Sequence, residues 1–253
     1  MEVLSSPKNP RIMAWRSLKD RKGRLAHGLF LVEGTRMVGE ALSSGFPVEA
    51  VLFRRGYPDM EAFPHDLPAY LLPEHIFDGI CDTRTPQGIA AVLRPNPRPA
   101  EGPCLLALDG VQDPGNVGTI LRTADAAGFD GVLLSGECAD CFSPKVLRAT
   151  MGSIFHIGLS FPDFLPEALL GLREKGYEIL SSQLDGEPFY GRPELVPPFV
   201  LVIGNEGNGI SDAVKQTATR RLRLPMRGGA ESLNAAVAAG IMMYDLTRSL
   251  PDE

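Results

Sequence analysis

Three stretches of this 253-residue sequence combine residue types that could do chemistry. The most distinctive is Gly204-Asn-Glu-Gly-Asn-Gly209, which directly follows the apolar run 199–203. Glycines let a backbone approach a ligand closely, whereas Glu206 would repel a phosphate, and the Gly-Lys-Ser/Thr of a Walker loop is absent. The pattern favours a ligand with a positive centre or hydroxyls, such as a sulfonium nucleoside. A glycine-rich turn with a solvated Glu is the alternative.

The second stretch, residues 109–128, places an amide and a cation on one expected helix. Asn116 is typical of a helix N-cap, because its side chain can accept from free N–H groups of the first turn. At 100° per residue the core-facing stripe starts at Val117, and Arg122 lies about 140° away from it. Arg122 therefore points away from the core, either toward a ligand or simply into solvent.

The third stretch runs from Leu224-Pro-Met226 through Ser232-Leu-Asn234 into a segment of small residues. No charged residue occurs between positions 232 and 244, so we expect a buried helix that Ser232 or Asn234 caps. Taken alone, this is an ordinary helix start.

The elements around these stretches alternate between strand and helix. Strands are expected at 105–108, 131–134, 177–180, 199–203 and 221–224, and helices at 116–127, 143–155, 163–175, 209–218 and 231–248. Such alternation predicts an α/β fold with a parallel sheet and helices on both faces. Ligands bind beyond the carboxyl ends of such strands, where all three stretches begin.

The sequence before residue 95 reads as a separate, smaller α/β domain. Strands are expected at 29–32, 48–53 and 89–93, and helices at 35–42 and from 73 to about 81. Four prolines within residues 95–103 indicate a linker. We therefore predict domains at 1–94 and 104–253, joined by 95–103.

Composition and charge narrow the class of protein. The net charge is −6, yet residues 1–36 hold eight basic and three acidic side chains. That cluster could contact RNA phosphates or form a solvated helix face. No apolar run reaches the length of about 18 residues that a membrane span needs, and no secretory signal is visible. Four cysteines suggest a reduced, cytoplasmic protein, and Cys138-Ala-Asp-Cys141 has no second ligand pair for a metal.

In this order, the three stretches closely resemble the SpoU–TrmH family of RNA ribose 2′-O-methyltransferases, in the SPOUT superfamily. The resemblance covers residues 104–249 and includes Asn116 to Arg122, Gly204-Asn-Glu206, Leu224-Pro-Met226 and Ser232-Leu-Asn234. Residues 143–153 resemble the segment between the first two motifs. Residues 6–12, 30–36 and 87–89 resemble the L30e-like RNA substrate-binding domain that these enzymes often carry.

The resemblance implies a C-terminal deep trefoil knot whose loops bind S-adenosylmethionine, and a homodimer whose site is completed across the interface. It maps cofactor binding to Gly204, Leu224, Met226 and Leu233. It turns the basic cluster into expected RNA contacts, at Lys8, Asn9, Arg11, Arg24 and Arg36. No metal is implied.

The implied reaction transfers the cofactor's methyl group to a ribose 2′-hydroxyl, which must lose its proton. None of the four His lies in the three stretches, and the family assigns the role of base to the residue that matches Arg122. An Arg with a pKa above about 12 rarely deprotonates, so stabilisation of developing negative charge is the alternative. Asn116, Glu206, Ser232 and Asn234 would position the reacting groups.

Ribosomal RNA is the favoured substrate because of the additional domain, with transfer RNA as the alternative. A knotted RNA-binding or assembly factor without catalysis is the other class. The presence of Arg122, Glu206 and Asn234 favours an enzyme.

Overall fold

The chain forms two compact units in the computed structural model, which describes residues 1–58, 60, 63 and 66–248. The first unit comprises Met1–Asn96 and Asp140–Phe155, and the second comprises Pro97–Ala139 and His156–Glu253. The division near residue 96 falls inside the expected linker. Residues 140–155, however, belong to the first unit rather than to the expected domain 104–253.

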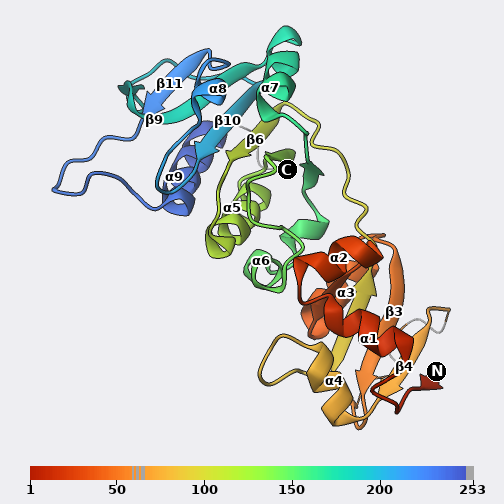
Figure 1. Cartoon of the computed structure of the whole chain (residues 1–253). Coiled ribbons are helices and arrows are strands. Elements are labelled where there is room, and N and C mark those ends of the chain that lie inside the picture. Colours follow the sequence, from red (N-terminus) through yellow and green to blue (C-terminus); the bar gives the residue numbers. More distant parts are fainter. Residues whose placement is uncertain (59, 61–62, 64–65, 249–253) are drawn as a thin grey trace. The chain divides into compact units, whose positions relative to one another are not determined.

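The first unit is built on a five-stranded mixed sheet (Figure 1). Its strand order is β1 (Glu2–Val3), β4 (Ala69–Leu72), β3 (Val48–Arg54), β5 (Ile89–Leu93) and β2 (Phe30–Glu33). The first three strands pair in parallel, whereas β5 runs antiparallel to both β3 and β2. Its helices in the Met1–Asn96 segment are α1 (Pro10–Ser17), α2 (Arg21–His27), α3 (Thr35–Ser43) and α4 (Glu74–Ile80). The expected strands are confirmed, and the structure adds the short strands β1 and β4 at one edge of the sheet.

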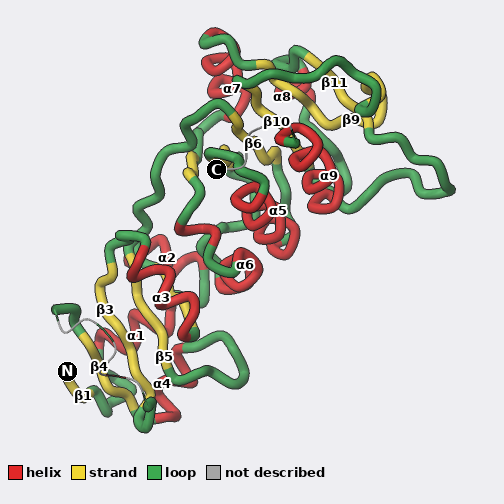
Figure 2. The backbone as a smooth tube through the Cα atoms, turned by 180° about the vertical axis from the view of Figure 1, so that it is seen from behind, coloured by secondary structure: helices red, strands yellow, loops and turns green. Residues whose placement is uncertain are grey.

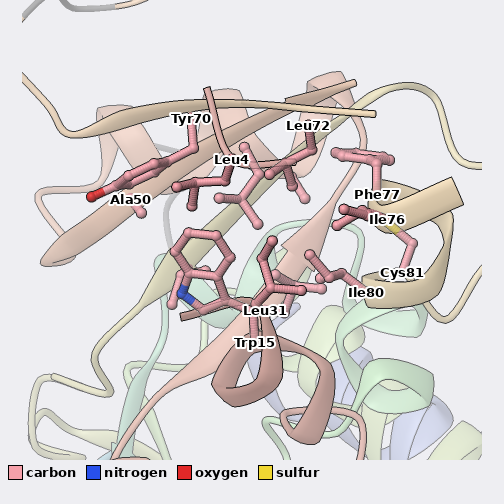
Figure 3. Packing of buried hydrophobic residues seen from close by; sticks show 14 of the residues in the cluster. Leu4, Trp15, Leu31, Ala50, Tyr70, Leu72, Ile76, Phe77, Ile80 and Cys81 are labelled. Carbon is pink, nitrogen blue, oxygen red and sulfur yellow. The ribbon is translucent and has the colours of Figure 1, made fainter. Parts of the chain in front are cut away.

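The core of the first unit lies between its sheet and helices α1 and α4. Trp15 of α1 is buried and packs against Tyr70 of β4, with 5.2 Å between ring centroids. Figure 3 shows Trp15 and Leu31 on the side of this cluster opposite Tyr70 and Leu72. The only tryptophan of the chain therefore reports on folding of this unit.

The segment 140–155 packs into the first unit through aromatic contacts and an ion pair. It contains α6 (Pro144–Thr150) and a short 3₁₀ turn at Ser153–Phe155. The Phe142 ring lies 4.7 Å from that of Phe30, and the Phe155 ring lies 5.1 Å from that of Phe46. Arg148 Nη1 also donates to Asp82 Oδ2 at 2.7 Å. These contacts explain why residues 140–155 fold with residues 1–96, which lie far away in the sequence.

Arg24 fastens the same segment and does not fit the expected role of an RNA contact. Its side chain is 8% exposed, and Nε and Nη2 donate to Asp140 Oδ2 at 2.9 and 2.7 Å. Nη1 donates to the carbonyls of Leu18 and Lys19. The guanidinium is therefore occupied by structural partners, which a charge count cannot reveal.

The second unit has a six-stranded, fully parallel sheet. The strand order is β11 (Arg220–Arg223), β9 (Glu178–Pro188), β10 (Phe199–Gly204), β6 (Cys104–Asp109), β7 (Gly131–Leu134) and β8 (Gly158–Ser160). Its helices are α5 (Pro114–Ala126), α7 (Leu165–Glu174), α8 (Asp212–Lys215) and α9 (Ala235–Thr247). This confirms the expected parallel sheet, to which the structure adds β8.

Helices cover both faces of this parallel sheet. Leu105 and Val200 share a core cluster with Leu169 of α7 and Val214 of α8. Because side chains alternate along a strand, the neighbouring residues face the opposite side. There α9 packs on β10, and α5 lies beside α9 (Figures 1 and 2). The site loops therefore emerge from a rigid, doubly covered sheet.

Part of the expected linker runs along the edge of the second unit's sheet. The N–H of Leu159 in β8 donates to the carbonyl of Arg98 at 2.7 Å. The N–H of Ala100 donates to Ser160 Oγ at 2.9 Å. These bonds satisfy edge groups that β8 would otherwise leave open.

Across the described residues, no helix is both long and apolar enough to traverse a membrane.

The buried Arg24–Asp140 pair predicts a specific loss of stability. Asp140→Ala should lower the free energy of unfolding by about 3 kcal/mol, because it leaves a buried guanidinium without its counterion. Trp15 fluorescence during urea denaturation measures this change.

The matched control is Glu2→Ala, which removes an ion pair to Arg11 whose side chains are 53% and 55% exposed. That variant should lose less than about 1 kcal/mol. Equal losses in the two variants would contradict the structural role of Asp140.

Candidate active site

A cavity of about 370 Å³ lies beside the middle of β9, the carboxyl end of β10 and the start of α9. Seven predicted site residues line it, namely Gly204, Glu206, Leu224, Met226, Ser232, Leu233 and Asn234. They come from two of the three motif loops. The remaining motif loop, which follows β6, reaches the cavity's rim through hydrogen bonds of Asn116.

The carboxylate of Glu206 is the centre of a network that joins the loops. Its Oε1 accepts from Asn116 Nδ2 at 2.8 Å and from the N–H of Asp113 at 3.2 Å. Its Oε2 accepts from the N–H of Gln112 at 3.2 Å. A side chain of the loop after β10 therefore holds the backbone of the loop after β6.

The orientation of Asn116 follows from the chemistry of its two partners. A carboxylate can only accept, so Asn116 turns its NH₂ group to Glu206 and its oxygen elsewhere. Asn116 Oδ1 accepts from Asn234 Nδ2 at 2.9 Å. Asn116 thus bridges Glu206 to the third loop.

Asn116 is not the helix cap that its residue type predicts. Asp113 caps α5, because its Oδ1 accepts from the N–H of Asn116 at 2.9 Å and Pro114 occupies the first helical position. An Asp-Pro start is favourable because proline lacks the N–H that would be left unpaired there. The Asn116 side chain is therefore left to the site.

Asn234, one of the two expected caps, begins α9 and belongs to the network. Its Oδ1 accepts from the N–H groups of Ala236 and Val237 at 2.9 and 3.3 Å. Its Nδ2 is then directed to Asn116. Ser232 lines the cavity in the exposed loop before α9 and caps nothing.

The pKa of Glu206 reflects this environment. Burial raises the pKa, but the hydrogen bond from Asn116 and those from the backbone of Glu206, Gln112 and Asp113 outweigh it. The net effect lowers the pKa below its ordinary value of 4.5. Glu206 is therefore an anion at neutral pH and a positioning group rather than a proton donor.

Gly204 and Gly209 are needed for the backbone geometry of the turn that carries Glu206. A Cβ on Gly204 would collide with the backbone of Gly209 and Ile210. Asn205 and Gly209 exchange two backbone hydrogen bonds of 2.9 Å, and Gly209 has φ +68°. Asn205 Nδ2 also donates to the carbonyl of Gly110 at 2.7 Å. Close backbone packing thus requires Gly204, beyond any need of a ligand.

Arg122 stands apart from the network. It is exposed on α5, as the helical stripe predicts, and has no hydrogen bond or ion pair with any described residue. It lies six residues beyond Asn116, about 9 Å along the helix axis. One chain alone therefore brings Asn116, Glu206 and Asn234 together without Arg122.

Four expected RNA contacts lie on the surface of the first unit. Lys8 and Arg36 are exposed. Asn9 caps α1 by accepting from the N–H of Arg11 at 2.9 Å. The guanidinium of Arg11 lies 5.1 Å from the Tyr70 ring centroid and pairs with Glu2. Unlike Arg24, these side chains can be reached from solvent.

Sequence reasoning named seven of the residues that line the cavity and missed the others, among them Gln183 of β9. It lines the cavity, is 9% exposed, and its Oε1 has no hydrogen-bond partner among the described residues. The available signal was a large polar side chain two residues after the buried strand segment Ile179–Ser181.

The network predicts a measurable change in the titration of Glu206. Asn116→Ala removes the strongest hydrogen bond that lowers the Glu206 pKa, so the pKa should rise. Carboxyl ¹³C NMR measures the midpoint of the Glu206 titration in the variant and in the unaltered protein. In the unaltered protein this midpoint should lie below 4.5.

The same shift fixes the sign of its contribution to stability. Because the Glu206 pKa is lower in the folded protein, the ionised carboxylate stabilises the fold at pH values above the ordinary pKa. This contribution is lost as the pH falls through the lowered pKa. An unchanged midpoint in Asn116→Ala would show that Asn116 does not hold the carboxylate.

Comparisons with known proteins agree with this geometry. The model of the SpoU rRNA Methylase family matches residues 103–244, and that of the MRM3-like substrate binding domain matches residues 9–91. The chain is 39% identical over 255 residues to the 23S rRNA (guanosine(2553)-2′-O)-methyltransferase RlmP of Bacillus subtilis, which covers 97% of this chain and 99% of that protein.

Two solved structures are similar over nearly the whole chain. An AdoMet-bound rRNA methyltransferase from Sinorhizobium meliloti has a TM-score of 0.89 and 31% identity, with 99% of both chains covered. A putative TrmH-family RNA methyltransferase from Porphyromonas gingivalis has a TM-score of 0.85 and 38% identity, with 95% of this chain and 98% of that chain covered. This chain therefore belongs to the SpoU rRNA methylase family.

Proposed function

We propose that this protein transfers the methyl group of S-adenosylmethionine to a ribose 2′-hydroxyl of ribosomal RNA. The observation that carries this proposal is the network of Asn116, Glu206 and Asn234 at the cavity. It joins all three motif loops around one space. Membership of the family supports the same reaction.

The cavity fits S-adenosylmethionine in size and in lining. Its volume of about 370 Å³ lies within the range of small-molecule sites. Leu224, Met226 and Leu233 supply an apolar wall, and the Glu206 anion suits a cationic ligand. When bound, the cofactor supplies an already activated methyl group.

The protein's own residues position the ribose and handle its developing charge. No His lies among the residues that line the cavity. Glu206 is saturated by N–H donors, which makes it a weak base. We therefore assign to Arg122 the binding of RNA phosphate and the stabilisation of negative charge at the 2′-oxygen, because a guanidinium keeps its proton at neutral pH.

The distance of Arg122 from the network supports a homodimer whose site combines two chains. Val237, Ile241 and Tyr244 form an apolar stripe on α9, with exposed fractions of 50%, 37% and 55%. Helix α9 packs against α5, which carries Arg122. A second subunit docked on this stripe would bury it and bring Arg122 of one chain to the cavity of the other.

The first unit would hold the RNA. Exposed Lys8, Arg11 and Arg36 can contact phosphates, and the substrate-binding family model covers this unit. A relative that covers both units is named a 23S rRNA methyltransferase, which supports ribosomal over transfer RNA. The intact network disfavours a non-catalytic assembly factor.

Finer features of the fold are also part of the proposal. Helix α9 returns from the edge strand β11 to pack on β10 and α5, which supports a trefoil knot in this segment. The sheet and flanking helices of the first unit support an L30e-like module. A ribosomal RNA substrate would be met in the cytoplasm.

The activity is tested by transfer of a labelled methyl group from S-adenosylmethionine into RNA from cells that lack this gene. Label should enter ribosomal RNA and resist alkaline cleavage at a single ribose. Label found only in transfer RNA would show that transfer RNA, and not ribosomal RNA, is the substrate. Absence of both label and cofactor binding would overturn the proposal.

Arg122→Ala should lower the transfer rate by about 100-fold or more, because it removes a charge that stabilises the transition state. Affinity for S-adenosylhomocysteine, measured by calorimetry, should stay within about twofold. Arg227→Ala, which changes an exposed Arg in the loop before α9, is a control for loss of charge alone. A near-normal rate in Arg122→Ala would remove this residue from the reaction.

The shared site predicts that two inactive variants restore each other. When Arg122→Ala and Asn234→Ala chains are mixed and reassociated, about half of the dimers are mixed and each has one intact site. About a quarter of the normal activity should return. No recovery, despite mixed dimers seen by native mass spectrometry, would place the whole site within one chain.

A further inference from the structure

A second cavity, of about 340 Å³, lies in the second unit beyond the carboxyl end of β6. Asn205 and Gly209 of the turn that carries Glu206 contribute to the lining of both this cavity and the cofactor cavity. Residues at the starts of α7 and α8 line the second cavity as well. None of the residues assigned above to catalysis or cofactor binding lines it, so the proposed reaction leaves this space unexplained.

The charges that line the second cavity are all negative. Its acidic residues are Asp109 at the end of β6, Glu137 after β7 and Asp163 before α7. Among the described residues that line it, none is Lys, Arg or His, and no described residue forms an ion pair with any of the three carboxylates. The electrostatic potential therefore opposes an anion such as a phosphate and favours a cation.

The carboxylate of Asp109 gives independent evidence that a cation is missing. Asp109 is 9% exposed, and its Oδ2 accepts from the N–H of Ser211 at 2.7 Å, so the carboxylate points to another residue of the cavity wall. Its Oδ1 has no hydrogen-bond partner among the described residues and retains accessible surface. A carboxylate as buried as this one is rarely left without a cationic partner. The cavity therefore contains an acceptor that the chain itself does not satisfy.

The arrangement of the lining favours an organic cation over a metal ion. The three carboxylates come from three separate loops, and the described residues contain no group of His, Cys, Asp or Glu side chains that could hold a metal ion. Phe164, Leu165 and Val214 give the cavity an apolar wall, and Phe164 is 53% exposed. Methylene groups suit such a wall, while separated ammonium groups suit separated carboxylates.

We propose that the second cavity binds an aliphatic polyamine, which is a chain of ammonium groups joined by methylene segments. The ammonium groups donate to the carboxylates of Asp109, Glu137 and Asp163, and the methylene segments lie against the apolar wall. This site is distinct from the cofactor cavity, and its ligand does not take part in methyl transfer. A polycation bound there offsets the repulsion between these carboxylates and the phosphates of an RNA substrate.

Calorimetric titration of the full chain with spermidine, in the absence of RNA, tests this proposal. The test variant combines Glu137→Gln with Asp163→Asn, because both side chains are exposed and neither has a hydrogen bond or ion pair with a described residue. Each change removes one negative charge and keeps the size of the side chain. Spermidine should bind the unaltered protein, and it should bind the double variant about tenfold more weakly, because two charge pairs are lost.

The matched control combines Glu178→Gln with Asp185→Asn, which removes the same charge at exposed positions outside the lining of both cavities. Its affinity for spermidine should equal that of the unaltered protein. Two further probes test the chemistry of the ligand. Nα-acetyllysine amide, which has a single ammonium group, should bind much more weakly than spermidine. Mg²⁺ at the same concentration as spermidine should not displace it.

Four results would overturn the inference. Spermidine that fails to bind the unaltered protein would remove the site, and equal weakening in the two double variants would show that only the net charge matters. Displacement by Mg²⁺ would show a site for any multivalent cation, and equal affinity for Nα-acetyllysine amide would show that one ammonium group is enough. The proposed function is tested separately, by methyl transfer and by binding of S-adenosylhomocysteine, so that either proposal can fail without the other.

Discussion

The Glu206 carboxylate is the constraint on which the rest of the site depends. Three N–H donors from the loop after β6 and from Asn116 converge on it, and they keep it ionised. Because it can only accept, it sets the orientation of Asn116, which in turn sets that of Asn234 at the start of α9. One charge thus orders three loops that are far apart in sequence. The parallel sheet makes this possible by ending β6 and β10 at the same edge.

Much of the second unit outside the site supports the edge of the sheet at which these loops meet. Helices cover both faces of the second sheet, so the loops at its carboxyl edge are the part left to form the site. The first unit is completed by residues 140–155, held by Arg24 and aromatic contacts. Arg24 therefore stabilises the fold, whereas the side chains of Lys8, Arg11 and Arg36 remain accessible to a polyanion. Similar charges therefore have different roles according to burial.

The sequence predicts the parallel sheet because apolar strands and amphipathic helices alternate with clear periods. It also predicts which loops meet, since parallel strands share a carboxyl end. It could not show that Asp113 rather than Asn116 caps α5, because both types suit a cap and the choice depends on Glu206 across the sheet. The burial of Arg24 and the unpaired oxygen of Gln183 likewise arise from tertiary packing. Local patterns contain no information about such partners.

The most direct test of the central claim is a double-mutant cycle on Asn116 and Asn234, read out as methyl transfer to RNA. If the network acts as one unit, Asn116→Ala and Asn234→Ala should each cause nearly the loss seen in the double variant. Coupling of about 1 kcal/mol or more is then expected between them. Losses that simply add would contradict the account, because they would show that the loops contribute separately and that Glu206 does not order them together.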